Sequence, residues 1–462
     1  MSAAAAWVET EEAGAVAARA SARLSVEKLI ARLDRTIGAQ LDAILHHPRF
    51  QQLEAGWRGL AYLAGHLRRT EKVILRVLTL TWGELAADLG RALEFDQTQL
   101  FNLIYAQEFD MPGGEPYGLL LADFPVGHRR RPGSALDDVD VVAGLAAVAT
   151  AAFAPVILPA KPELVGLDDF AELTATIDLD AVFRDADHRR WQNFRRSDEA
   201  RFVGVIAPRV LMRAPYRDDG AQRYGFRYRE TIANGRGYLW GSGLYVFGTV
   251  VARVFARHGW LAEICGIGEA DDPRGLVDDL PTPPFGLGSS GVLVRQPVEI
   301  NLSDDLAQRL GALGIIVLQP SAFTPWLALF DCPSLQVAAA WSTSGARANA
   351  ALGTMLPYML CVSRFAHYVK VIARDRIGSF TTLTEFEAFL AGWLQSYSIS
   401  NEDVSPAQKA RYPLRESRVS LSEVPGRPGA LACVIHLRPH LRFQQVVAGF
   451  DLYTELASPN GL

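Results

Sequence analysis

A glycine-rich stretch, GLGSSG, is the segment whose residue types come closest to a known chemistry. Its glycines Gly286, Gly288 and Gly291 fit the spacing GxGxxG. In that motif a strand, a tight turn and a helix N-terminus together bind the pyrophosphate of a dinucleotide. Here proline-rich PTPPF precedes the glycines and a predicted strand follows them. We therefore interpret Gly286–Gly291 as a loop, and keep a nucleotide-dependent α/β enzyme as the alternative function from a different class.

Two histidine pairs could suggest a metal site. His46 and His47 are neighbours at a predicted helix end, so their side chains diverge, and His436 and His440 are separated by LRP. Pro439 argues against regular strand pairing there, and neither pair has a third ligand at a suitable spacing. No GxSxG, HExxH, Walker A or kinase motif occurs. We therefore predict no metal, no cofactor and no catalytic residue, and expect that the protein is not an enzyme.

An arginine-rich run, HRRWQNFRRSDEAR, spans residues 188–201 and includes Trp191. Arginines mixed with aromatic residues are typical of nucleic-acid-binding faces. Acidic residues are interleaved, however, and the chain has a formal net charge of −5. A helix whose aromatic side packs inward while its arginines pair with acidic groups or meet a protein partner fits equally well. We expect no nucleic-acid partner and select Arg190 and Arg195 as candidate subunit-interface residues.

A large folded body must position these residues. The chain has 462 residues, of which 49% are hydrophobic and 21% charged, so we expect a large core and little disorder. The four cysteines are far apart and form no CxxC motif. This usage favours a reducing compartment, and we expect a cytoplasmic protein. The N-terminus lacks the basic segment of a signal peptide.

One uncharged run, residues 141–160, is as long as a membrane span. Pro155 and Pro159 interrupt it, and acidic residues before it suit a helix N-terminus. We therefore expect a buried helix to about Phe153, a core strand over 156–158, and no membrane insertion.

Hydrophobic periodicity along the chain predicts an α/β, or mixed α+β, fold in which helices flank mixed sheets. We divide the chain into an N-terminal arm (1–23), an N-terminal helical segment (24–70), a middle α/β region (71–340) and a C-terminal helix with strands (341–462). Predicted helices cover 24–46, 50–69, a stretch from about 81, 240–257, 303–314 and 382–397. Predicted strands cover 72–78, 117–123, 202–208, 292–301, 314–320 and three segments within 414–456.

The strongest helical pattern runs from Asn349 to Phe380. Apolar residues recur at helical spacing from Met355 to Ala373, which predicts a long helix packed into a core. Pro357 sits early in this helix or kinks it. Arg364, Arg374 and Arg376 fall largely off the apolar stripe or near its far end.

Several long segments resemble the TssC/VipB/EvpB family, the large subunits of the contractile sheath of type VI secretion systems. The similarity extends over about residues 36–456. The similar segments are residues 37–63, 101–124, 183–216, 238–247, 349–380, 409–417 and 423–440. They include FNLIYAQEFDMPGGEPYGLLLADF and NAALGTMLPYMLCVSRFAHYVKVIARDRIGSF.

This resemblance implies a structural role. Family members assemble with a small sheath subunit (TssB/VipA) into a helical tube around the Hcp inner tube, attached to a baseplate, and contract to propel that tube. Neighbouring subunits complete one another's sheets with strands. The ATPase ClpV disassembles the contracted sheath by binding a leucine/isoleucine motif near the N-terminus. The short arm ahead of residue 24 has no clear copy of that motif, so recycling by ClpV is doubtful.

The resemblance also gives the arginines of the 349–380 helix a possible role. Arg364, Arg374 and Arg376 become candidates for contacts between subunits or with the tube. An alternative within the same family is an accessory or baseplate-proximal paralogue in an atypical contractile system.

Overall fold

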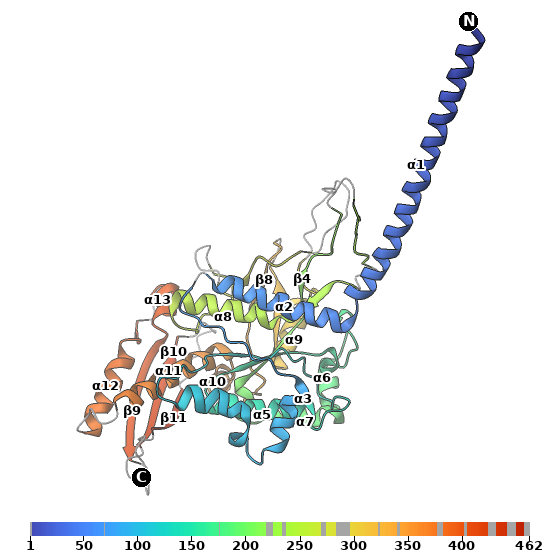
Figure 1. The fold of residues 1–462 in the computed structure, drawn as a ribbon. Helices are drawn as coiled ribbons and strands as arrows, with labels where there is room; N and C mark the ends of the chain where they lie inside the picture. The colour runs from blue at the N-terminus through green and yellow to red at the C-terminus, as the bar shows by residue number, and fades with distance from the viewer. Residues whose placement is uncertain are drawn as a thin grey trace.

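A six-stranded sheet lies at the centre of the folded protein and has helices on both faces (Figure 1). The structure, a computed structural model, describes residues 2–68, 70–174, 176–218, 225–232, 237–268, 274–282, 296–321, 324–339, 342–376, 382–401, 404–423, 431–440 and 450–456. The predicted GLGSSG loop lies outside these residues.

The helices and strands alternate along the middle of the chain. The helices are α1 Ser2–Leu45, α2 Pro48–Leu67, α3 Trp82–Arg91, α4 Gln99–Phe101, α5 Asp138–Ala151, α6 Leu179–Arg184, α7 Arg189–Phe194, α8 Leu244–His258, α9 Asp304–Ala312, α10 Ser344–Gly353, α11 Leu356–Arg376, α12 Leu383–Gln395 and α13 Pro406–Arg411. The strands are β1 Leu120–Leu121, β2 Val156–Pro159, β3 Val203–Ala207, β4 Val210–Arg213, β5 Leu239–Gly241, β6 Leu276–Val277, β7 Ile315–Pro320, β8 Leu327–Leu329, β9 Leu414–Glu423, β10 Leu431–Pro439 and β11 Phe450–Leu456.

The central sheet is mixed, as expected for the predicted fold class. Its strand order is β1-β2-β3-β7-β8-β6. The first four strands are parallel, whereas β8 runs antiparallel to both β7 and β6. A separate antiparallel sheet, β11-β10-β9, lies near the C-terminus, and β4 and β5 form a two-stranded pair.

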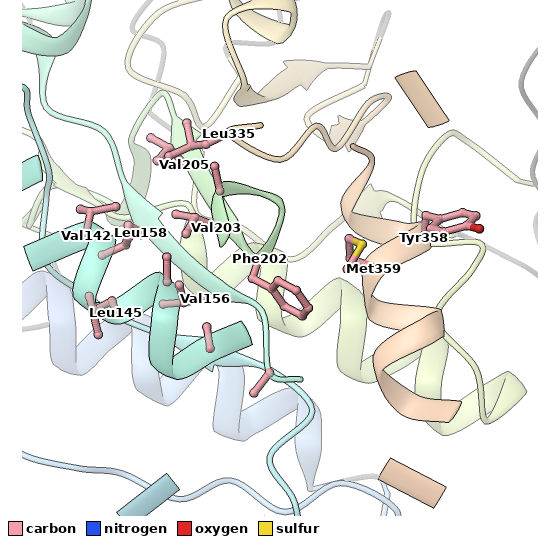
Figure 2. Close-up of a cluster of buried hydrophobic side chains, with 14 of the residues drawn as sticks. Val142, Leu145, Val156, Leu158, Phe202, Val203, Val205, Leu335, Tyr358 and Met359 are labelled. Atoms are coloured by element: carbon pink, nitrogen blue, oxygen red, sulfur yellow. The ribbon is translucent and has the colours of Figure 1, made fainter. Parts of the chain in front are cut away.

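Alternate residues of the central strands face two hydrophobic clusters. Val156 and Leu158 of β2 belong to the cluster that contains α5, whereas Ile157 belongs to the cluster that contains α8. Figure 2 shows Val142 and Leu145 of α5 beside Val156 and Leu158 of β2. Successive strand residues point to opposite faces, so one strand contributes to both layers.

The uncharged run at 141–160 is part of this core. As predicted, it forms a buried helix and then a buried strand, and the Asp137 side chain caps the helix by accepting a hydrogen bond from the Val139 amide. The predicted cap of α9 is also confirmed, because Ser303 accepts from the Leu306 amide. Among the described helices, none is long and apolar enough to span a membrane.

The strong helical pattern at 349–380 forms two helices instead of one. α10 ends at Gly353, α11 begins at Leu356, and Pro357 is the second residue of α11. Because proline needs no amide partner in the first helical turn, it favours a new start there. The predicted stripe is buried: Met359, Val362 and the later stripe residues through Ala373 are at most 2% exposed.

α11 packs against the central sheet at its N-terminal end. A Cβ atom on Gly204 of β3 would lie 2.6 Å from Leu356 Cδ1 and 2.7 Å from Ile157 Cδ1. Both side chains are fully buried, so neither has room to move. The close approach of helix and sheet therefore depends on the missing side chain at Gly204.

Replacing Gly204 by alanine is expected to destabilise the fold by about 1–3 kcal/mol, because one methyl group overpacks this contact. Urea unfolding of the full chain measures the difference. Gly65→Ala is the matched control, since no heavy atom outside its own helix lies within 4 Å of the added Cβ. Equal stability of the two variants would show that the contact tolerates a side chain.

Four other predictions about elements need correction. The predicted helix 24–46 extends back to Ser2, because alanine-rich sequence before residue 24 favours helix without an apolar stripe. The predicted strand 117–123 shortens to Leu120–Leu121, and residues 296–301 form only an isolated bridge, between Val298 and Val210. The predicted strand 72–78 pairs with no strand in the part of the chain that the structure describes.

Candidate assembly interface

The most prominent exposed apolar surface lies on α1, which projects away from the body of the protein (Figure 1). Leu29, Leu33 and Ile37 follow one another at four-residue spacing and are 60%, 61% and 43% exposed. A surface helix normally buries such a stripe against its own core. Here the stripe faces solvent over several turns, and exposed apolar patches of this kind are typical of interaction sites.

α2 also has an exposed apolar side. Leu53 and Trp57 are exposed, whereas Ala55, Gly59 and Leu63 on the other side are buried. α2 packs along α8 through its buried side, and a Cβ on Gly59 would overlap the ring of Tyr245. One side of α2 is therefore held against the body, and the other remains available for a partner.

A buried ionic network fixes the base of α1. The guanidinium of Arg213, on β4, donates to Glu230 Oε2 at 2.6 Å and to Glu54 Oε1 of α2 at 2.9 Å. The Glu230 side chain is 1% exposed and also accepts from the Tyr216 amide. His46 Nε2, just after α1, lies 3.2 Å from Glu230 Oε1.

The pKa values of this network favour its charged form. Burial alone would raise the pKa of Glu230, but hydrogen bonds from Arg213 and the Tyr216 amide outweigh burial and lower it below the usual range. At Asp42 of α1 burial also opposes ionisation, yet hydrogen bonds from Tyr228 and Thr231 lower the pKa. The Tyr228 hydroxyl donates to Asp42 at 2.6 Å. The last turn of α1 is thus tied to the loop that follows β4.

The C-terminal sheet has two outer strands, β9 and β11. The outer edge of β9 is occupied at two points, by a bridge between Leu414 and Ser398 and by Glu387, which accepts from the Leu421 amide at 3.3 Å. β10 pairs with the inner edge of β9, and between these two points no strand in the described ranges pairs with its outer edge. Unpaired sheet edges are sites where another chain can add a strand.

Two of the arginines selected from the sequence bind within the chain. Arg190 donates to Asp137 and Asp140 at the start of α5, at 2.7 and 2.6 Å. Arg195 is 3% exposed, and its guanidinium donates to the carbonyl oxygens of Leu335 and Ala312. Burial lowers the pKa of Arg195 to about 10. Because its donors are used internally, we do not carry Arg195 forward as an interface residue.

The other three selected arginines lie on α11. Arg364 donates to the Tyr368 hydroxyl at 3.0 Å, and Arg374 donates to the Met111 carbonyl oxygen at 2.6 Å. Arg376 is the last residue of the helix. Among the described residues, no contact joins this group to Arg190 or Arg195. Arg190, Arg364, Arg374 and Arg376 stay proposals for subunit contacts.

Two of the histidines named from the sequence, His46 and His440, contact other parts of the chain. His440 Nε2 lies 2.8 Å from the Ile399 carbonyl oxygen. In the described residues there is one group of possible metal ligands, formed by His66, Asp278 and Asp279. Their ligand atoms all lie within 4.8 Å of one another. Arg253 lies 3.5 Å from Asp278 and already supplies a cation there. His66 and Asp278 are half-buried and Asp279 is exposed, and the group carries no proposal.

The sequence predicts this candidate interface only in part. The apolar stripe of α1 is visible as helical periodicity, but a stripe that faces the core and one that faces a partner have the same spacing. The Arg213–Glu230–Glu54 network has no sequence signal, because its members come from segments far apart in the chain.

Comparison with known proteins gives consistent results. Two family models match: the EvpB/VC_A0108 tail sheath N-terminal domain over residues 27–336, and the EvpB/VC_A0108 tail sheath gpW/gp25-like domain over residues 345–456. The type VI secretion system sheath protein TssC1 of Pseudomonas aeruginosa is 33% identical over 443 residues, which cover 94% of this chain and 86% of that protein.

A solved structure shows a weaker similarity. It is a chain of the cryo-EM structure of the anti-feeding prophage baseplate, 6-fold symmetrised, with a TM-score of 0.33 and 6% sequence identity. The match covers 62% of this chain and 56% of that one. A similarity this low supports no argument about fold or function.

Proposed function

The chain belongs to the EvpB/VC_A0108 tail sheath family, and we propose that it assembles with a small sheath subunit and with copies of itself into a helical tube. It is a large sheath subunit of a type VI secretion system, and its role is structural. In the proposed assembly the tube surrounds Hcp, is anchored on a baseplate in the cytoplasm, and contracts.

The observation that supports assembly most directly is the exposed apolar stripe along α1 and α2. Leu29, Leu33 and Trp57 would each stabilise a complex by about 1.5–3 kcal/mol if a partner buried them fully. The ionic network around Arg213 holds the base of α1 in one direction. A preoriented helix loses little conformational freedom when a partner binds, which favours association.

Contraction requires a subunit that moves as a block. The three-layer body around the central sheet supplies rigidity, while α1 and the outer strands supply contacts that can rearrange. Recycling by ClpV has weaker support in this proposal, because residues before 24 contain no clear copy of the leucine/isoleucine motif.

Deleting residues 1–22 is expected to leave the fold intact and to prevent polymerisation with the small sheath subunit. Residues 16 and 18–22, whose side chains the structure describes, are exposed, so the loss of these residues removes no core contact. The full-length and shortened chains would each be co-expressed with the small subunit and examined by negative-stain electron microscopy.

Circular dichroism and thermal unfolding of the two purified chains provide the control for folding. Normal tubes from the shortened chain would contradict the role of the arm. Failure of the full-length chain to form any complex with the small subunit would contradict the proposed function itself.

A further inference from the structure

Two of the four cysteines lie side by side in the fold, although they are far apart in the sequence. Cys265 follows α8 and Cys332 follows β8. Cys265 packs against the hydrophobic cluster that contains Cys332, and the two side chains make a hydrogen bond with each other. Both are free cysteines. A disulfide between them would need only a small movement of the two side chains.

Backbone hydrogen bonds hold the two segments together beside the thiols. The Gly266 amide donates to the Leu329 carbonyl oxygen at 2.7 Å, and the Leu329 amide donates to the Gly275 carbonyl oxygen at 2.9 Å. Cys265 directly precedes Gly266, so the main chain next to it is attached to the end of β8. The main chain therefore keeps the two cysteines close, whatever conformations their side chains adopt.

The two cysteines differ in their access to solvent. Cys332 is fully buried, whereas Cys265 is half-buried. Burial raises the pKa of the Cys332 thiol, and the neighbouring Cys265 thiol and Asp331 carboxylate raise it further. A small oxidant in the solvent therefore reaches Cys265 first, while Cys332 stays a protonated thiol that reacts only with a group already in contact with it.

Cys332 also lies where the two matched parts of the chain meet. The family models cover residues 27–336 and 345–456. The Cys332 carbonyl oxygen accepts a hydrogen bond at 2.9 Å from the amide of Leu356, the first residue of α11. The next residue, Pro333, forms an isolated bridge with Met355. A covalent bond at Cys332 would therefore tie the start of α11 to the connection that follows α8.

We propose that Cys265 and Cys332 form a reversible disulfide when the protein meets a hydroperoxide, and that this bond fixes the joint between the two parts of the chain. In a reducing compartment such bonds form transiently, under oxidising conditions. The inference goes beyond the proposed function and does not depend on it.

The reaction has two steps. The Cys265 thiolate attacks one oxygen of hydrogen peroxide, the O–O bond breaks, and the departing hydroxide takes up the proton that the thiol has lost, which leaves a sulfenic acid and water. The Cys332 sulfur then attacks the sulfenic sulfur, the S–O bond breaks, and hydroxide leaves with the Cys332 proton as a second water. Two thiols lose two electrons, and one peroxide is reduced to two waters. A dithiol reductant reverses the bond by thiol–disulfide exchange.

Thiol counting and peptide mapping test the proposal. The purified full-length chain would be treated with hydrogen peroxide, unfolded, alkylated and analysed by mass spectrometry. The number of free thiols is expected to fall from four to two, with Cys265 and Cys332 in one linked pair of peptides, and dithiothreitol should restore all four. The oxidised chain should also unfold at a higher urea concentration than the reduced chain, because the crosslink restricts the unfolded state.

Single substitutions separate this pair from the other cysteines. Cys265→Ala should abolish the crosslink and leave Cys332 reduced, and peroxide should then no longer change the urea midpoint. Cys332→Ala should leave Cys265 as a sulfenic acid that dimedone labels. Cys361→Ala is the matched control, since Cys361 is also fully buried but belongs to the other hydrophobic cluster. This variant should form the Cys265–Cys332 disulfide as wild type does.

Three results would overturn the proposal. The first is four free thiols after a treatment that oxidises glutathione in the same solution. The second is oxidation of Cys265 to a sulfinic acid while Cys332 stays free, which would show that the two thiols do not react with each other. The third is a disulfide between Cys265 residues of two chains. None of these results bears on assembly with the small sheath subunit, so the proposed function is tested separately.

Discussion

Replacing Arg213 by methionine is expected to destabilise the folded chain by about 3–5 kcal/mol, the usual cost of leaving a buried charge without its partner. The Arg213 side chain is 7% exposed and that of Glu230 is 1% exposed. Without the guanidinium, the Glu230 carboxylate keeps only the Tyr216 amide and His46 as partners. Urea unfolding at neutral pH measures the loss.

The loss of stability caused by Arg213→Met should become smaller as the pH falls. In wild type the pKa of Glu230 is lowered, so its stabilising contribution is complete above the usual value of 4.5 and is lost as the pH falls through the lower folded pKa. In the variant, burial favours the neutral acid. Protonation then relieves the unpaired charge, so the difference between wild type and variant should shrink as the pH falls toward 4.

Arg58→Met is the matched control. Arg58 pairs with the same Glu54 at 2.7 Å, but its side chain is 40% exposed. Exposed pairs contribute about 1 kcal/mol or less. Equal destabilisation by the two substitutions, or a penalty at Arg213 that does not change with pH, would contradict the view that a buried ionic network holds the base of α1.

The triple substitution Leu29→Ser, Leu33→Ser, Ile37→Ser is expected to abolish tube formation without lowering the stability of the body. These side chains contribute little to the core because they are exposed on α1. Losing three apolar side chains from an interface removes several kcal/mol of binding free energy, or more than about a thousandfold in affinity. Co-expression with the small sheath subunit and electron microscopy test the prediction.

The control changes a different, charged face of the same helix. Lys28→Ser, Arg32→Ser and Arg35→Ser alter three exposed residues over a similar length, and serine lowers helix propensity by a similar amount in both triple variants. Tubes are expected from this control. If both triple variants assemble, the apolar stripe is not the contact surface; if neither assembles, the loss comes from the helix itself and not from one face.

Much of the fold follows from local sequence signals. The helix at 138–151 with its Asp137 cap, the Ser303 cap of α9 and the buried stripe from Met359 to Ala373 were predicted from spacing and residue type. Each depends on neighbours a few residues away. The break between α10 and α11 was not predicted, because the apolar pattern continues through it and only Pro357 marks the new start.

The partners of exposed or buried polar groups were harder to predict. In the sequence, Arg195 lies in an arginine-rich run and was selected as a candidate interface residue. In the structure its guanidinium donates to carbonyl oxygens more than a hundred residues away in the chain. The division into four regions, with boundaries after residues 23, 70 and 340, stays a prediction.

The sequence by itself determined the alternation of helices and strands, the family and the apolar stripes, because these are properties of spacing, residue type and extended similarity. Only the tertiary structure decided which stripes are buried and which face solvent. The stripe of α11 is covered by the chain's own core, whereas the stripe of α1 and the side chains of Ile74, Val77 and Leu78 are exposed. The reason is physical: periodicity indicates that a helix or strand has an apolar face to bury. Only the fold shows whether that face is buried by the same chain.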